Sequence, residues 1–149
     1  MMMDEMYYPS QEIYKDYSVK KEMIAMDGDK VKVEDSILLS IKKLLGMDPI
    51  EFTQYDTDLI IHINTIIEFL NQLGVDIPEG FKINDENALW SDYLNKPEYN
   101  GIKDSIKNYI YLRVRLVFDP STNSSLLNSI NDTIKELEWR IRTYIEFYE

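Results

Sequence analysis

The chain has 149 residues, no cysteine and a formal net charge of −11, and its length fits one domain with a sizeable core. The lack of cysteine excludes disulfides, thiolate metal sites and cysteine nucleophiles. The negative charge argues against nucleic-acid binding, which needs cations that neutralise phosphates, and no apolar run is long enough to span a membrane.

The negative charge is concentrated in the middle of the chain. Residues 34–100 contain thirteen acidic and four basic residues, a balance of −9, whereas residues 1–33 contain seven and five and residues 101–149 contain seven of each. A surface this acidic is well solvated and repels DNA.

Residues 1–33 differ in composition from the rest of the chain. Six of the seven methionines lie here, together with Tyr7, Tyr8, Tyr14 and Tyr17. One interpretation is a helix from Ser10 to about Met26, and a second is a hairpin that turns on Asp27-Gly28. We predict an N-terminal arm with little independent structure, which orders against a partner through its four tyrosines, and a helical domain over residues 34–149.

Two helices are predicted next. Asp35 or Ser36 can cap the first, and Gly46 follows its end. Its apolar residues recur at helical spacing: Ile37, Leu38, Ile41, Leu44 and Leu45. Asp56 is the predicted cap of the second, with Asp58 in the first turn and Gly74 after the end. Its predicted buried stripe consists of Ile60, Ile63, Ile67 and Leu70.

A turn at Pro78-Glu79-Gly80 and a short helix over residues 84–95 are predicted to follow. Residues 102–118 alternate apolar and polar side chains as a strand does, but they also fit helical spacing. The stretch has no Gly or Pro and is too long for an ordinary strand. We therefore predict a central helix that is apolar almost all round and ends at Asp119-Pro120.

The last predicted helix runs from about Ser124 to the end. Its apolar residues form a heptad seam: Leu127, Ile130, Ile134, Leu137, Ile141, Tyr144 and Tyr148. The pattern as a whole predicts an all-α fold, a small bundle of four to five helices with an N-terminal arm.

No constellation of residues predicts catalysis. His62, the only histidine, can meet Asp58 one turn earlier on a helix, but further metal ligands at recognisable spacing are missing. The pairs Asp56/Asp58 and Asp85/Glu86 stand at predicted helix starts, where acidic groups stabilise the helix dipole. We predict that the chain is not an enzyme and holds no cofactor or metal.

Two groups of residues are predicted to make contacts. Arg113 and Arg115 interrupt the apolar central helix, so each needs a carboxylate, either from the acidic middle segment or from a neighbouring copy at a subunit interface. Aromatic residues crowd the C-terminus: Trp139, Tyr144, Phe147 and Tyr148. Such residues predominate in binding hot spots, so this end is predicted to dock on its own bundle or on a partner.

The chain carries, in this order, the runs Asp35–Leu38, Ile41–Gly46, Phe52–Ile60, His62–Asn64, Leu73–Val75, Trp90–Tyr93, Val114–Ser121 and Leu137–Arg140. In order and spacing they resemble the head–tail connector (adaptor) proteins of tailed bacteriophages, over about residues 34–142. The arm has no counterpart in this resemblance.

The resemblance implies a structural virion protein of the neck, made in the host cytoplasm. Such proteins form a homo-oligomeric, usually dodecameric ring that joins the capsid portal to the tail and extends the DNA channel. The implied partners are the portal protein, bound by the aromatic C-terminus, and tail or neck proteins. Double-stranded DNA passes without specific binding, and the acidic middle segment fits a lumen along which DNA slides.

Two other classes of function stay open on the sequence. An acidic DNA-mimic inhibitor, or another protein-binding module, would share the charge of −11 but act as a monomer or dimer. An enzyme with an unrecognised site is the third class. Ring formation separates the connector from both.

Overall fold

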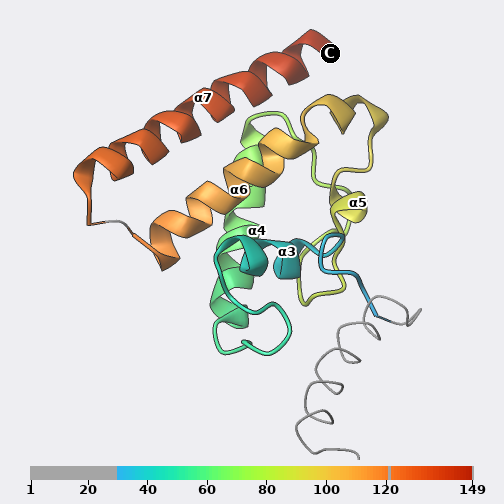
Figure 1. Ribbon diagram of the computed structural model, residues 1–149. Helices are drawn as coiled ribbons and strands as arrows, with labels where there is room; N and C mark the ends of the chain where they lie inside the picture. Colours follow the sequence, from blue (N-terminus) through green and yellow to red (C-terminus); the bar gives the residue numbers. More distant parts are fainter. Residues whose placement is uncertain (1–29, 121, 149) are drawn as a thin grey trace, which may run out of the picture.

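The computed structural model describes residues 30–120 and 122–148, and these residues form helices joined by loops (Figure 1). The elements are α3 (Ile37–Leu44), α4 (Asp56–Gln72), α5 (Trp90–Tyr93), the 3₁₀ helix η1 (Pro97–Gly101), α6 (Lys103–Phe118) and α7 (Ser124–Tyr148). The described ranges contain no strand, only an isolated bridge between Ser36 and Leu89. The predicted all-α bundle is confirmed.

Helix α6 is the centre of the bundle. It packs against α3, α4, α7 and η1, and Figure 1 shows it between α4 and α7. Ile106, Ile110 and Val114 are fully buried, as a helical period requires. The prediction of a helix rather than a strand at residues 102–118 is therefore confirmed. The helix is not buried all round, because Val117 is 53% exposed.

Helix α3 begins where the sequence predicts. The backbone N–H of Leu39 donates to Ser36 Oγ at 3.2 Å, so Ser36 is the cap. Leu44, predicted on the buried side, is 54% exposed, and Lys42 is fully buried instead. The inward face of α3 therefore ends in a lysine.

Helix α4 differs from its prediction at the first residue. Tyr55 is at the N-cap position and Asp56 is the first helical residue, so Asp56 is not the cap. Of the predicted stripe, Ile63, Ile67 and Leu70 are buried while Ile60 is only partly buried. Leu59 and Ile66 complete the buried face.

The long connection after α4 is held by side-chain hydrogen bonds. Asn64 Nδ2 donates to Ile83 O at 2.8 Å, and Ile83 N donates to Asn64 Oδ1 at 3.0 Å. The predicted helix over residues 84–95 shrinks to α5, because Asn87 N donates to Asp85 Oδ1 in a local turn at 2.8 Å. Asp85 and Glu86 therefore do not stand at a helix start.

Helix α7 buries a seam that departs from the predicted heptad at its last turn. The buried residues are Ile130, Ile134, Leu137, Ile141 and Ile145. Tyr144 is partly buried and Tyr148 is 57% exposed. A single α-helix has 3.6 residues per turn, so its buried side drifts by one position relative to a repeat of 3.5. The buried Ile145 packs closely against Gly74, where a Cβ would lie 2.8 Å from Ile145 Cγ2.

Two buried tyrosines differ in the partners of their hydroxyls. Tyr93 is fully buried, and its hydroxyl has no hydrogen-bond partner among the described residues. The Tyr109 hydroxyl donates to Glu138 Oε2 at 2.7 Å and accepts from Arg113 Nη1 at 3.3 Å. Burial raises the pKa of Tyr93 far above its usual range. Burial, followed by the hydrogen bond with Glu138, likewise raises the pKa of Tyr109.

We expect the two tyrosines to respond differently to removal of the hydroxyl. Tyr93→Phe should leave the free energy of unfolding unchanged or raise it by about 1 kcal/mol, since it removes an unpaired buried hydroxyl. Tyr109→Phe should lower it by about 1–2 kcal/mol, since Glu138 loses its donor. Urea denaturation at neutral pH measures both values, and equal losses would contradict the assignment.

The same pair predicts an alkaline loss of stability. The folded-state pKa of each tyrosine is raised, so the unfolded chain loses its protons first, at about pH 10. The stabilising difference is complete below about pH 10 and is lost as the pH rises toward the folded-state values. Each Phe variant should therefore lose less stability than the parent protein between neutral pH and about pH 11.

Candidate interaction surfaces

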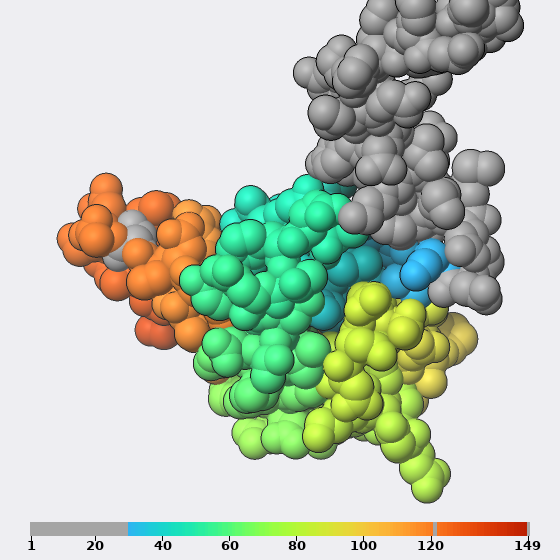
Figure 2. All heavy atoms as spheres, turned by 90° about the horizontal axis from the view of Figure 1, so that it is seen from below, coloured from blue at the N-terminus to red at the C-terminus, as the bar shows by residue number. Residues whose placement is uncertain are grey.

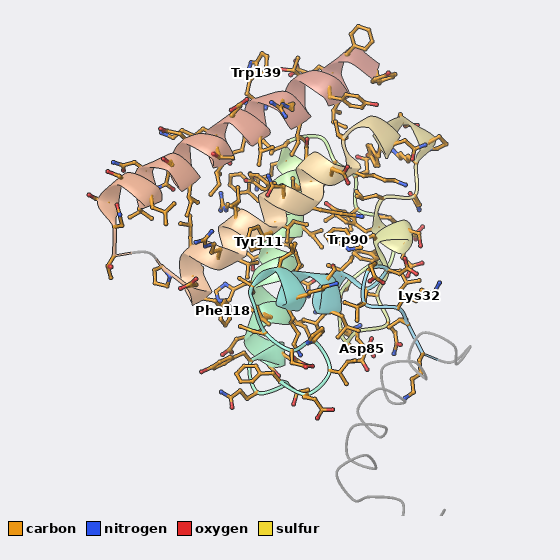
Figure 3. All side chains as sticks on the ribbon, viewed as in Figure 1. Lys32, Asp85, Trp90, Tyr111, Phe118 and Trp139 are labelled. Carbon is orange, nitrogen blue, oxygen red and sulfur yellow. The ribbon has the colours of Figure 1, made fainter. Side chains whose placement is uncertain are left out.

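The outer face of α7 exposes large aromatic side chains. Trp139 is 67% exposed, Phe147 80% and Tyr148 57%. Figure 3 shows Trp139 on the side of α7 that faces away from α6. Three of the four residues predicted to bind a partner thus present aromatic surface to solvent, and we call Trp139, Phe147 and Tyr148 the α7 aromatic surface.

Tyr144 has a different position from these three residues. Its hydroxyl donates to the carbonyl oxygen of Glu98 at 2.8 Å and lies against Gly101, where a Cβ would come within 2.5 Å of it. The Tyr144 and Tyr148 rings lie 4.7 Å apart, and the Phe147 and Tyr148 rings 5.2 Å. Tyr144 and the buried Ile145 therefore dock the end of α7 on its own bundle, and this docked end presents Phe147 and Tyr148 to solvent.

Arg113 has contacts within its own chain. Its Nη1 lies 3.6 Å from Glu138 Oε2, and its guanidinium lies 4.7 Å from the centre of the Phe69 ring. The charged partner within the chain is thus on α7, not in the acidic middle segment, which was one of the two predicted alternatives. A cation above an aromatic ring and beside a carboxylate is well stabilised.

Arg115 is less firmly held. Its Nε lies 4.0 Å from Asp119 Oδ2, an (i, i+4) contact at the end of α6. The Asp119 side chain is 74% exposed and the Arg115 side chain 29%. An exposed pair at this distance contributes little stability, so Arg115 can exchange Asp119 for another carboxylate.

A buried ion pair was not predicted from the sequence. The Lys42 side chain is fully buried; its Nζ lies 2.8 Å from Asp56 Oδ1 and donates to the carbonyl oxygen of Pro49 at 3.0 Å. The available signal was the position of Lys42, four residues after Leu38 and one after Ile41 on an apolar helix face. The pair joins α3, the loop before α4 and the start of α4.

His62 belongs to a second aromatic cluster, formed where α4 begins and α6 ends. Its ring meets Phe118 edge-on at 5.6 Å, and Phe118 lies 6.0 Å from Tyr55. Ile61 and Val117 nearby on the two helices are 58% and 53% exposed. Within residues 30–120 and 122–148, no group of histidine and acidic residues could hold a metal ion. His62 makes a packing contact with Phe118.

The tyrosines predicted for the arm, Tyr7, Tyr8, Tyr14 and Tyr17, lie outside the described residues, as does the helix or hairpin considered for residues 10–29. The hairpin hypothesis makes residues 23–26 and 30–33 its two strands, and the second of these has no strand pairing. None of the helices in the described part of the chain is long and apolar enough to cross a membrane.

The outer helix of this small bundle thus presents exposed aromatic side chains. The comparison with known families identifies the class: the model of the phage connector protein family matches residues 37–146, from the start of α3 to the last turn of α7. The chain belongs to the phage connector protein family. It matches no curated protein and no solved structure.

Membership of this family confirms the resemblance to head–tail connectors over most of the helical domain. Connector proteins are structural components of the phage particle that associate with one another and with proteins of the portal and tail. The match begins at residue 37, so it does not include the N-terminal arm.

Proposed function

We propose that this protein forms a closed, dodecameric ring that joins the capsid portal to the tail and extends the DNA channel. The observation that carries the proposal is the family match, which spans residues 37–146 and includes α3 through most of α7. In this proposal the protein has a structural and not a catalytic role.

The distribution of charge supports a channel. Residues 34–100 carry a balance of −9, and Figure 2 shows that segments 45–60 and 78–90 from this region lie on the same face of the molecule. A ring that turns this face inward has a lumen that repels the phosphate backbone. DNA then slides through during ejection, because binding would need cations.

Ring formation is the test of the proposal. Native mass spectrometry and negative-stain imaging of the full chain, alone and with the portal protein of the same phage, should show a closed oligomer. A monomer or dimer in both conditions would contradict the ring. If that species also inhibited a DNA-binding enzyme, it would favour the DNA-mimic alternative, which the charge of −11 keeps open.

Arg113 and Arg115 are the proposed residues of the subunit interface, and single variants distinguish them. Arg115→Ala should weaken ring assembly with little change in the melting temperature, because its contact with Asp119 is long and exposed. Arg113→Ala should also lower the melting temperature, because it removes the contacts with Glu138 and Phe69. A fall in melting temperature without a change in assembly, for both variants, would place both arginines inside one subunit.

We propose that the α7 aromatic surface, with Tyr144 as its support, binds the portal. Trp139→Ala combined with Phe147→Ala should weaken co-purification with the portal at least about tenfold, since buried aromatic residues dominate interface energies. Both side chains are exposed in the subunit, so the circular dichroism melt should stay unchanged. Leu126→Ala, an exposed apolar change at the other end of α7, is the matched control.

Point substitutions test this surface better than a truncation. Removing residues 144–149 would delete the buried Ile145 and the hydrogen bond from Tyr144 to Glu98, so it would also loosen the end of α7. Full portal binding by the Trp139 and Phe147 variant would show that a different surface meets the portal. In that case the arm, with Tyr7, Tyr8, Tyr14 and Tyr17, becomes the first candidate. Otherwise we propose that the arm contacts a neighbouring subunit or another virion protein.

A further inference from the structure

A groove lies where α3, α5 and α6 meet. It has a volume of about 470 Å³ and is lined by Val33, Glu34, Ser40, Lys43, Leu44, Trp90 and Lys107. A second hollow of about 290 Å³ shares Glu34, Trp90 and Lys107 with it. Because the two share three residues, they form one continuous depression, which we call the Trp90 groove. Figure 3 labels Trp90 at the start of α5.

The groove presents apolar surface that the described residues leave uncovered. Leu44, the last residue of α3, is 54% exposed although its spacing predicted it on the buried side. The indole N–H of Trp90 donates to Ser40 Oγ at 2.9 Å, so the polar edge of this ring is already satisfied. Burial of this apolar surface by an occupant would be favourable by about 25 cal/mol for each Å² removed from water. The occupant that fits is an apolar segment of chain.

The charge of the rim is opposite to that of the protein. Lys43, Lys103 and Lys107 contribute three positive charges to the lining of the two hollows, and Glu34 and Asp35 contribute two negative charges. The balance is +1 in a chain whose net charge is −11. Lys107 Nζ lies 5.3 Å from the centre of the Trp90 ring. No acidic residue in the described ranges forms an ion pair with Lys43 or Lys107. The rim therefore favours an acidic occupant.

The chain supplies a segment with these properties next to the groove. Residues 22–29 read Glu-Met-Ile-Ala-Met-Asp-Gly-Asp, with three acidic residues, no basic residue and an apolar centre. They lie outside the described residues, but the described chain begins at Lys30, and Val33 itself lines the groove. Asp27-Gly28 is a turn sequence.

We propose that residues 22–29 occupy the Trp90 groove of their own chain. Met23, Ile24 and Met26 cover the apolar surface of Leu44 and Val33 beside the buried Trp90 ring, and methionine adapts well to an irregular surface. The flanking carboxylates meet Lys43 and Lys107. A segment tethered this close has an effective concentration in the millimolar range, so it competes well against any separate protein.

This docking has a consequence for the proposed ring. It holds the base of the arm against α3 and α5, so the tyrosine-rich residues 1–17 leave each subunit from a fixed point. Only this consequence rests on the proposed function. The docking itself is a property of a single subunit and stands whether or not a ring forms.

Cysteine cross-linking of the full chain tests the docking. The protein has no cysteine, so the double variant Met26→Cys/Leu44→Cys places one thiol on the segment and one at the groove. The control is Met26→Cys/Leu126→Cys, since Leu126 is also an exposed leucine, on α7. A short bismaleimide is added to a mixture of isotopically heavy and light copies, and mass spectrometry separates cross-links within a chain from those between chains.

We expect within-chain cross-linking of the groove pair to exceed that of the control at least about tenfold. Adding Lys43→Glu and Lys107→Glu should reduce it to the control level, with circular dichroism verifying the fold. Equal cross-linking of groove and control pairs would overturn the docking. Heavy–light cross-links would show instead that a neighbouring copy supplies the segment, and cross-linking unchanged by charge reversal would overturn the role of the two lysines.

Discussion

Replacing Asp56 with alanine should lower the free energy of unfolding by about 3 kcal/mol. The Lys42 side chain is fully buried, and its ammonium contacts the Asp56 carboxylate at 2.8 Å and the carbonyl oxygen of Pro49 at 3.0 Å. Removing the carboxylate leaves a buried positive charge with a single neutral acceptor. Breaking a buried ion pair in this way typically costs about 3–5 kcal/mol, and the lower end applies because Asp56 is 27% exposed.

The two partners should not be equivalent. Lys42→Met removes the buried charge and keeps an apolar side chain, while the partly exposed Asp56 can turn to water, so the loss should stay below about 1.5 kcal/mol. Asp58→Ala is the matched control, since Asp58 is exposed in the same first turn of α4 and contributes about 0.5 kcal/mol through the helix dipole. Urea denaturation measures all three variants. Equal losses for Asp56→Ala and Asp58→Ala would show that the pair contributes nothing beyond the dipole.

The second large effect is expected in the core. Ile63→Ala should lower the free energy of unfolding by about 2–5 kcal/mol, because Ile63 is fully buried on the face of α4 that packs into the core and its removal leaves a cavity. For a chain of this length, each kcal/mol corresponds to a fall of about 2–4 °C in melting temperature. A calorimetric or circular dichroism melt therefore resolves the change.

Ile61→Ala is the control on the same helix. Ile61 is 58% exposed, so its truncation should change the free energy of unfolding by no more than about 0.5 kcal/mol. The two positions carry the same residue type two places apart, so helix propensity cancels between them. A loss at Ile61 equal to that at Ile63 would mean that the buried face of α4 includes Ile61.

Several features of this protein were determined by its sequence alone. The Ser36 cap, the end of α4 before Gly74 and the helical character of residues 102–118 follow from local chemistry: side chains that bond nearby backbone groups, glycine at a helix end, and apolar residues at helical spacing. The family also follows from the order and spacing of short runs along the chain. These signals are local, so they can be interpreted from the sequence without knowing which helices pack together.

The tertiary structure decided which side chains face inward at the boundaries of the helices. Lys42 replaces Leu44 on the buried side of α3 because Asp56, fourteen residues later, reaches it. Ile145 is buried where the heptad seam predicted Tyr144, because a straight helix packs with a period of 3.6 residues. The carboxylate that meets Arg113 comes from Glu138 on the neighbouring helix.

The candidate binding surface was also determined partly by the sequence and partly by the tertiary structure. Composition predicts that the aromatic C-terminus makes contacts, but it does not separate Tyr144 from Trp139 and Phe147. That separation comes from Glu98, whose carbonyl oxygen accepts the Tyr144 hydroxyl, and from Gly101, which leaves room for the ring. Both residues are distant in sequence and adjacent only in the folded chain. Local sequence specifies helices and their apolar stripes, whereas the long-range contact that docks Tyr144 turns the other aromatic side chains toward solvent.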